Sequence, residues 1–256
     1  MSLRSRLVTV PSVKFFAKHY YPFITRTSGD DLEFMNWGYE EDPPMTLPLE
    51  GSDEPNRFPI QLYHRTATQV DLKGKKVLEV SCGHGGGASY LVRTLGPASY
   101  TGLDLNAAGV DSCRKRHQLR GLDFVQGNAE SLPFPDQSFD AVINIEASHL
   151  YPQFPRFLAE VARVLRPGGH FLYADVRQGD GVAKWNEDLG DAPMRLISEK
   201  VINGEVARAV EKNVPQLFKM MSRVTPAFFV DKLKGELGRK LSNGKFSYRM
   251  YCFANE

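Results

Sequence analysis

Cysteine is scarce in this sequence of 256 residues, which contains only Cys82, Cys113 and Cys252. The three are odd in number and none forms a CxxC pair, the spacing typical of structural zinc sites. We therefore expect no structural zinc, and cysteines that stay reduced, as in a cytoplasmic protein.

Long hydrophobic runs are also missing. No stretch of about 18 apolar residues occurs, so we expect no transmembrane helix.

A large excess of either charge is absent as well. The chain has 32 Lys and Arg against 30 Asp and Glu, which leaves a net charge of +2. This balance gives no electrostatic reason to expect nucleic acid as a partner. The longest basic cluster, residues 114–117, is interpreted as a solvated helix face.

The first 29 residues are an exception to this balance, because they contain basic side chains and no acidic one. This composition is typical of a mitochondrial transit peptide. It is equally typical of a basic segment that packs on the domain or contacts a membrane surface. We favour the packed segment, and keep peripheral membrane contact and mitochondrial targeting as alternatives.

The rest of the chain alternates between short apolar runs and segments of helical periodicity. The expected strands are 77–80, 100–105, 122–126, 139–145, 170–176 and 246–253. The expected helices are 61–70, 88–95, 107–118 and 154–165, the last ended by Pro167-Gly168-Gly169. This alternation predicts an α/β fold with a doubly wound, mostly parallel sheet and right-handed crossovers.

We expect three regions along the chain. Residues 1–58 form an N-terminal cap segment and a linker rich in proline and acidic residues. Residues 59–180 and 242–256 form the core. Residues 181–241 show helical spacing and no clear strand, which predicts a helical cap inserted before the last strand.

A glycine-rich loop follows the first expected strand, in the run Glu79-Val-Ser-Cys-Gly83-His-Gly85-Gly-Gly-Ala88. Glycines at such a place let the backbone turn sharply and let a ligand approach closely. The next strand ends near Asp104, which lies 19 positions after Gly85. That offset is typical of an acid that binds a ribose. Because the loop also satisfies the pattern G-x-G-x-x-A, an NAD(P) site stays open at this point.

Three further features favour a different cofactor. Glu79 lies within the strand before the glycines, where a dinucleotide site usually has an apolar residue. The third expected strand is followed by segment 127–135, which reads Gly-Asn-Ala-Glu-Ser-Leu-Pro-Phe-Pro. Segment 138–147 reads Ser-Phe-Asp-Ala-Val-Ile-Asn-Ile-Glu-Ala, and one helix separates it from Leu165-Arg-Pro-Gly-Gly. Over residues 77–175, this ordered set resembles the class I S-adenosylmethionine-dependent methyltransferases. The resemblance implies a seven-stranded, mostly parallel Rossmann-like sheet with helical caps.

A closer resemblance lies outside these motifs. It is carried by Asn36-Trp-Gly-Tyr-Glu-Glu-Asp-Pro-Pro, Leu62-Tyr-His-Arg-Thr-Ala-Thr-Gln-Val, Glu146-Ala-Ser-His and Ser247-Tyr-Arg-Met-Tyr-Cys-Phe. These segments resemble the mycobacterial phthiotriol/phenolphthiotriol dimycocerosate methyltransferases and their fatty-acid and glycolipid O-methyltransferase relatives. The resemblance covers most of the chain from about residue 31 and is weakest in 181–241. It implies that a lipid hydroxyl receives the methyl group.

The resemblance also implies a set of cofactor contacts. Asp104 is expected to bind both ribose hydroxyls and Leu105 to cover the adenine, whose edge Asn128 and the backbone of Ala129 would recognise. Glu79 is expected to act, directly or through water, on the amine end, and Tyr39 or Trp37 to close over the cofactor. The expected cofactor-binding set is Glu79, Gly83, Gly85, Asp104, Leu105, Asn128, Ala129 and Tyr39.

The loop departs from the family pattern D-x-G-x-G-x-G at two positions. Glu79 stands in place of Asp, and Ser81 in place of the first glycine. Glutamate keeps the charge on a longer arm. We expect Ser81 to allow the tight turn with a negative φ.

The acceptor end needs a group that removes a proton if the acceptor is a hydroxyl. His149 follows the fourth strand and is the expected general base, with Asp175, at the end of the fifth strand, orienting its imidazole. Glu146 is expected to contact the cofactor or to anchor the loop, and His64 is a second candidate base. His84 is interpreted as a turn residue.

Other expectations concern the environment of these residues. His117 is expected to be solvated. Glu146 and Asp175 are residue types that can bind a divalent ion, but no ligand spacing requires a metal, so none is predicted. The apolar residues Leu217, Phe218, Met220, Met221, Phe228 and Phe229 either line an acceptor pocket or form the core of the cap.

We therefore expect an S-adenosylmethionine-dependent O-methyltransferase that acts on a hydroxyl of a lipophilic, polyketide-type small molecule, as a monomer or homodimer. A sugar hydroxyl and a fatty-acid carboxylate stay open as acceptors, and an NAD(P)-dependent oxidoreductase is the remote alternative. An amino-methyltransferase of nucleic acid is disfavoured, because residues 144–147 read Asn-Ile-Glu-Ala and contain no Pro-Pro-aromatic motif.

Overall fold

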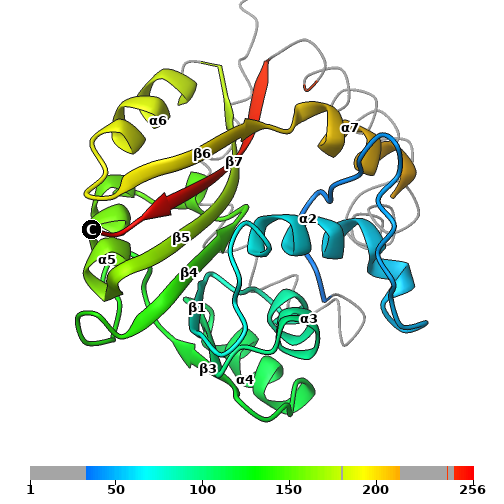
Figure 1. Ribbon diagram of the computed structural model, residues 1–256, viewed down its shortest axis with the longest axis horizontal. Coiled ribbons are helices and arrows are strands. Elements are labelled where there is room, and N and C mark those ends of the chain that lie inside the picture. The colour runs from blue at the N-terminus through cyan, green and yellow to red at the C-terminus, as the bar shows by residue number, and fades with distance from the viewer. Residues whose placement is uncertain (1–32, 180, 214–240, 242–244) are drawn as a thin grey trace, which may run out of the picture.

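A seven-stranded sheet, in the order β3-β2-β1-β4-β5-β7-β6, forms the centre of the molecule (Figure 1). The computed structural model describes residues 33–179, 181–213, 241 and 245–256. The strands are β1 Lys76–Val80, β2 Ser99–Asp104, β3 Leu122–Gln126, β4 Phe139–Ile145, β5 Leu165–Gln178, β6 Arg195–Val201 and β7 Phe246–Ala254. The first five are parallel, whereas β7 pairs antiparallel with both β5 and β6. The predicted fold class is confirmed.

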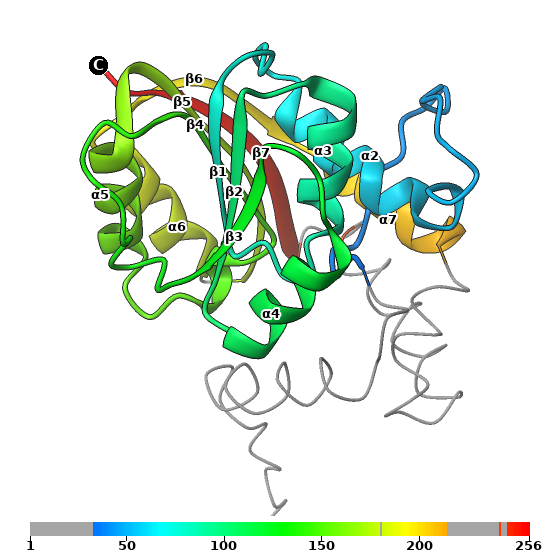
Figure 2. The ribbon, with the colours of Figure 1, turned by 90° about the horizontal axis from the view of Figure 1, so that it is seen from below.

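Helices cover both faces of this sheet (Figure 2). The helices are α2 Arg57–Ala67, α3 Gly86–Leu95, α4 Ala107–Arg116, α5 Phe154–Val164, α6 Gly181–Gly190 and α7 Asn203–Lys212, with short 3-10 turns η2 Glu54–Asn56 and η3 Ser148–Leu150. In Figure 2, α5 and α6 lie on one side of the sheet, and α2, α3 and α7 lie on the other. The four predicted helices are α2 to α5, and α2 begins before the predicted position.

The sequence of α5 shows why a helix forms there. Its buried side chains recur three or four positions apart, at Phe154, Phe157, Leu158, Val161 and Val164. This spacing places them on one face, which packs against β5 and its neighbours. The helix ends at Val164, and β5 begins at the next residue.

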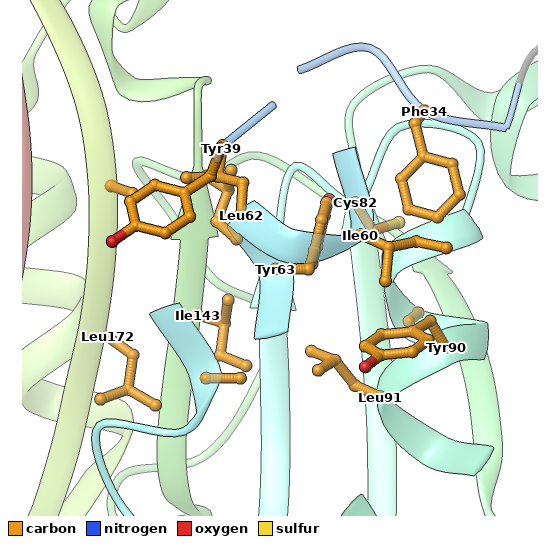
Figure 3. Close-up of a cluster of buried hydrophobic side chains, with 14 of the residues drawn as sticks. Phe34, Tyr39, Ile60, Leu62, Tyr63, Cys82, Tyr90, Leu91, Ile143 and Leu172 are labelled. Atoms are coloured by element: carbon orange, nitrogen blue, oxygen red, sulfur yellow. The ribbon is translucent and has the colours of Figure 1, made fainter. Parts of the chain in front are cut away.

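Each central strand contributes side chains to two hydrophobic clusters, because successive residues of a strand point to opposite faces. In β1, Leu78 and Val80 belong to the cluster on the side of α5 and α6, and Val77 belongs to the opposite one. Figure 3 shows part of the latter, with Tyr63 of α2 beside Cys82. Both faces of the central strands are thus buried, as expected for a doubly wound sheet.

The chain reverses direction across the sheet at β1. From β1 the chain moves outward to β2 and β3, and then returns to the other side of β1 at β4. In open α/β sheets, ligands bind in the crevice at such a switch point, beyond the carboxyl ends of the strands. The segments that follow β1, β2 and β4, together with the neighbouring part of β5, are therefore the expected ligand site.

One strand lies in the region that was expected to be a helical cap without strands. Arg195–Val201 forms β6, the edge strand, and pairs with β7. All seven of its residues are exposed, so it shows no alternation between polar and buried apolar positions. The expectation of a strandless cap is wrong for this segment. The apolar residues predicted between 217 and 229 and the basic segment 1–29 lie outside the described residues.

Candidate active site

The glycine loop joins β1 to α3 through a series of left-handed backbone conformations. Gly83 and Gly85 have φ angles of 57° and 79°, and α3 begins at Gly86. Ser81 has a φ of 61°, so the expected negative φ is wrong. A side chain with a Cβ is strained in this region, and such strain concentrates at functional sites.

Aromatic rings pack directly against the glycines of this loop. A Cβ on Gly87 would lie 2.0 Å from the Tyr63 ring, and a Cβ on Gly85 would lie 2.8 Å from the His117 ring. His117 is buried, and its Nε2 lies 2.9 Å from the His84 carbonyl oxygen. The expectation that His117 is solvated is therefore wrong, because its imidazole packs against Gly85 and the backbone of His84.

Glu79 lies below the loop with its carboxylate between two tyrosines. Its oxygens accept hydrogen bonds from the hydroxyl of Tyr63 at 2.7 Å and from that of Tyr100 at 2.8 Å. Burial raises the pKa of Glu79 to about 7, although both hydroxyls oppose the shift. The partners present here are protein groups, so the expected action of Glu79 on the cofactor amine stays a prediction.

Asp104 ends β2 beside the loop. One of its oxygens accepts the backbone N–H of Gly83 at 3.0 Å, and the other accepts that of Asn106 at 2.9 Å. Burial raises the pKa of Asp104, whereas these backbone hydrogen bonds lower it. The next residue, Leu105, is 68% exposed. The structure therefore places an ordered carboxylate and a free apolar side chain together at this strand end.

The segment after β3 forms a tight turn. Asn128 Oδ1 accepts the backbone N–H of Glu130 at 2.9 Å, and Asn128 pairs with Ser131 through an isolated bridge. Ala129 between them is buried. The turn follows β3, the parallel neighbour of β2, so it lies at the same carboxyl-end edge of the sheet as Asp104. The expected adenine contacts of Asn128 and Ala129 stay predictions.

Tyr39 lies elsewhere. Its side chain is fully buried, and within the described residues its hydroxyl contacts Glu41 and Lys200. In Figure 3 it lies on the far side of Leu62 from Cys82. The structure does not bring Tyr39 to the glycine loop. Other N-terminal residues do reach the loop: Met35 Cε lies 2.8 Å from the place of a Cβ on Gly83, and the Phe34 ring lies 2.8 Å from that of a Cβ on Gly86.

The predicted pair of His149 and Asp175 is present where the loop after β4 meets β5. Nδ1 of His149 lies 2.8 Å from Oδ1 of Asp175, and the backbone N–H of His149 donates to Oδ2 at 3.0 Å. The Asp175 side chain is fully buried, whereas that of His149 is 29% exposed. His149 and Arg177 hold the pKa of Asp175 well below its usual range, despite the burial of the carboxylate. Asp175 in turn raises the pKa of His149.

A second layer of polar side chains holds Asp175 in place. Ser148 Oγ donates to Asp175 Oδ2 at 2.6 Å, and Arg177 forms an ion pair with the same oxygen at 3.2 Å. Arg177 also donates to Ser148, and its guanidinium lies 4.8 Å from the centre of the Trp185 ring. Trp185 donates to the hydroxyl of Tyr173, which lies 2.6 Å from Ser148 Oγ.

This supporting layer was not predicted from the sequence. The sequence feature that could have revealed it is the alternation of Tyr173, Asp175 and Arg177 in a strand that was otherwise expected to be buried and apolar. Alternate residues of a strand share one face, so three polar side chains at this spacing indicate a buried polar network.

Glu146 follows β4 with a φ of 48°. Its Oε1 accepts the backbone N–H of Trp37 at 2.7 Å and the hydroxyl of Tyr248. Burial raises the pKa of Glu146 to about 7. These contacts tie the N-terminal segment and β7 to the loop that carries His149, and they support the loop-anchoring alternative for Glu146.

His64, the second candidate base, is hydrogen-bonded to the hydroxyl of Tyr90 at 2.8 Å. Both residues lie on helices, α2 and α3, that pack against each other. Burial lowers the pKa of His64.

Within the described residues, no group of three His, Cys, Asp or Glu side chains is arranged to hold a metal ion. In the same part of the chain, no helix has the length and apolarity needed to cross a membrane.

Solved structures share this fold. The crystal structure of the [4+2]-cyclase SpnF matches 96% of this chain and 97% of its own with a TM-score of 0.72 at 18% identity. A geranyl diphosphate C-methyltransferase from Streptomyces coelicolor matches 97% of this chain and 99% of its own with a TM-score of 0.70 at 15% identity. At such low identity these matches show the fold alone.

Sequence comparisons are more specific. A methyltransferase domain model matches residues 78–173. The phthiotriol/phenolphthiotriol dimycocerosates methyltransferase of Mycobacterium tuberculosis is 57% identical over 100% of this chain and 97% of its own length. The fatty-acid O-methyltransferase of Mycolicibacterium smegmatis is 55% identical over 92% of this chain and 88% of its own. These relatives remove the oxidoreductase alternative. The chain belongs to the phthiotriol/phenolphthiotriol dimycocerosates methyltransferase family and is an S-adenosylmethionine-dependent methyltransferase.

Proposed function

We propose that this enzyme transfers the methyl group to a hydroxyl of a lipophilic small molecule, with His149 as the general base. The observation that carries the proposal is the hydrogen bond between His149, in the loop after β4, and Asp175, in the neighbouring part of β5. The names of the relatives support a lipid as the acceptor, since they refer to phthiotriol compounds and to fatty acids.

The groups at the strand ends fit the cofactor. The backbone N–H groups of Gly83 and Asn106 hold the Asp104 carboxylate in place, where its oxygens can also accept hydrogen bonds from ribose hydroxyls. The exposed side chain of Leu105 offers an apolar surface to the adenine, with Asn128 and Ala129 at its edge. Gly83 and Gly85 let the backbone approach. Tyr39 is not part of this proposed set, because its hydroxyl contacts Glu41 and Lys200 and not the glycine loop.

When bound, the cofactor supplies an electrophilic methyl group on a sulfonium, so the protein has to position the acceptor and remove its proton. Asp175 is ionised and can only accept, so the proton between the two residues belongs to Nδ1 of His149. The other ring nitrogen, Nε2, then carries a lone pair. It is this atom that would take the proton of the acceptor hydroxyl.

Asp175 contributes a second effect. Once Nε2 has taken a proton, the imidazole is cationic, and the adjacent carboxylate stabilises that cation. The direction of the His149 pKa shift, upward through Asp175, is consistent with this role. A hydroxyl has a pKa far above 7, so a base is useful for this acceptor, whereas a carboxylate acceptor is already ionised and needs none.

The acceptor class can be tested with three lipids of equal chain length: a secondary alcohol, a fatty acid and an alkyl glycoside. Each is incubated with cofactor labelled in its methyl group. We expect the alcohol to be labelled most rapidly, and the His149→Ala variant to lose that activity. Labelling of the fatty acid alone, at equal rates in both enzymes, would instead establish the carboxylate alternative. Preferential labelling of the glycoside would establish the sugar hydroxyl.

A further inference from the structure

Three polar side chains meet at the switch point between β1 and β4, and neither the cofactor set nor the proposed base includes them. Ser81 Oγ lies 2.6 Å from the hydroxyl oxygen of Tyr151. Asn144 Nδ2 lies 2.9 Å from the same hydroxyl and 2.8 Å from the carbonyl oxygen of Val80. The Tyr151 ring is held in place by an edge-on contact with Phe157, at 4.9 Å between centroids.

The chemistry of these groups indicates a direction for each hydrogen bond. The Val80 carbonyl only accepts, so the Asn144 amide must turn its NH2 group toward it, and the second N–H then donates to the Tyr151 oxygen. Of the two hydrogen-bond partners of the Tyr151 hydroxyl among the described residues, Asn144 Nδ2 donates and Ser81 Oγ can accept, so we assign the Tyr151 hydrogen to Ser81. The hydrogen of the Ser81 hydroxyl is therefore left over, and it can donate outward from the network.

The cost of this arrangement indicates a role beyond packing. Ser81 adopts a φ of 61°, where a glycine would be unstrained. Asn144 Oδ1 is buried and has no hydrogen-bond partner among the described residues. A buried acceptor without a partner is unfavourable. The fold keeps both unfavourable features, and together they hold the partly buried Ser81 side chain at the carboxyl end of β1.

We propose that Ser81 donates its hydroxyl hydrogen to the carboxylate at the methionine end of S-adenosylmethionine, with Tyr151 and Asn144 as positioning residues. The proposal rests on the ribose role of Asp104. With the ribose at the end of β2, the ligand crosses the end of β1 toward β4, which brings its methionine end to Ser81. Only an acceptor can pair with a free hydroxyl hydrogen. The carboxylate accepts, whereas the ammonium and the sulfonium do not.

Two ligands that differ only at this end test the proposal by calorimetry. S-adenosylhomocysteine has the amino-acid end, and 5′-methylthioadenosine lacks it while keeping the ribose and the adenine. In Ser81→Gly, we expect the Kd of S-adenosylhomocysteine to rise roughly tenfold, as for one lost hydrogen bond to a charged group, and that of methylthioadenosine to stay unchanged. Because glycine is unstrained at this φ, the variant should unfold at the same or a higher temperature.

Two further variants make the result specific. Tyr151→Phe keeps the ring but cannot orient Ser81, so it should weaken S-adenosylhomocysteine selectively and to a smaller extent. Asp104→Ala should weaken both ligands if the ribose role is correct, which separates a failure of that role from a failure of this proposal. Unchanged binding of S-adenosylhomocysteine to Ser81→Gly, or an equal loss for both ligands, would overturn the assignment of Ser81. An unchanged Tyr151→Phe would overturn that of Tyr151.

Discussion

Nδ1 of His149 lies 2.8 Å from Oδ1 of Asp175 and so joins the loop after β4 to β5. The pairing of the two strands creates this contact. Ile145 pairs with Ala174, so the residue after Ala174 lies level with the beginning of the loop that carries His149. The buried carboxylate thus fixes the orientation of a partly exposed imidazole at the edge where ligands bind in this fold.

The ribose role of Asp104 predicts a loss of cofactor affinity. In Asp104→Ala, two charge-assisted hydrogen bonds to the ribose would be lost, each worth about 1.5–3 kcal/mol. We expect the Kd of S-adenosylmethionine to rise at least tenfold by calorimetry. Asp111→Ala is a matched control, because Asp111 is an exposed residue of α4 that pairs only with Arg114 among the described residues. Native affinity in Asp104→Ala would refute the role.

The position of Arg177 predicts a shift in the pH profile. Arg177 lowers the pKa of His149, while Asp175 and Glu146 raise it. In Arg177→Met that opposing charge is gone, so the pKa of His149 should rise. A base must be neutral to accept a proton, and the acidic limb of kcat/KM should therefore move to higher pH. Arg177→Lys keeps the charge and should move the limb less. A limb that stays in place or moves to lower pH in Arg177→Met would argue against this coupling.

Glu79 predicts a pH dependence of stability. Its pKa is about 7 in the folded protein, above that of an unfolded glutamate, about 4.3, so the folded state binds the additional proton between these values. The contribution of Glu79 to stability is therefore complete below pH 4 and declines as the pH rises toward 7, by at most about 1.4 kcal/mol per pH unit.

Urea unfolding at pH 5 and pH 8 measures this effect. In Glu79→Gln the decline between the two pH values should be smaller than in the wild type, although Glu146, whose pKa is also about 7, leaves part of it. Glu187→Gln, at an exposed position of α6, should preserve the wild-type decline. An equal decline in all three proteins would show that Glu79 does not titrate in this range.

The parts of this fold that follow from the sequence are those with strong local signals. The strands at 77–80 and 139–145 are apolar because both faces are buried, and a glycine loop or a polar segment follows each. The pairing of His149 with Asp175 could be predicted because His149 was expected just past the fourth strand and Asp175 near the same edge of the neighbouring fifth strand, although β5 extends beyond Asp175 to Gln178.

The parts that were missed depend on tertiary contacts. β6 has no buried face, and its two adjacent apolar residues, Leu196 and Ile197, do not alternate with polar ones. His117 follows three basic residues, which suggested a solvated face, but its ring fits under Gly85. The left-handed backbone of Ser81 is held by the surrounding loop and by Tyr151, neither of which a local pattern reveals.

The most direct test of His149 as the general base is the rate of methyl transfer in His149→Ala. Single-turnover reactions on a lipid alcohol, with saturating cofactor and calorimetry to confirm its binding, isolate the chemical step. We expect native cofactor affinity and a rate lower by roughly 10²–10⁴-fold, the contribution typical of a general base. A rate equal to that of the wild-type enzyme would refute the role of His149.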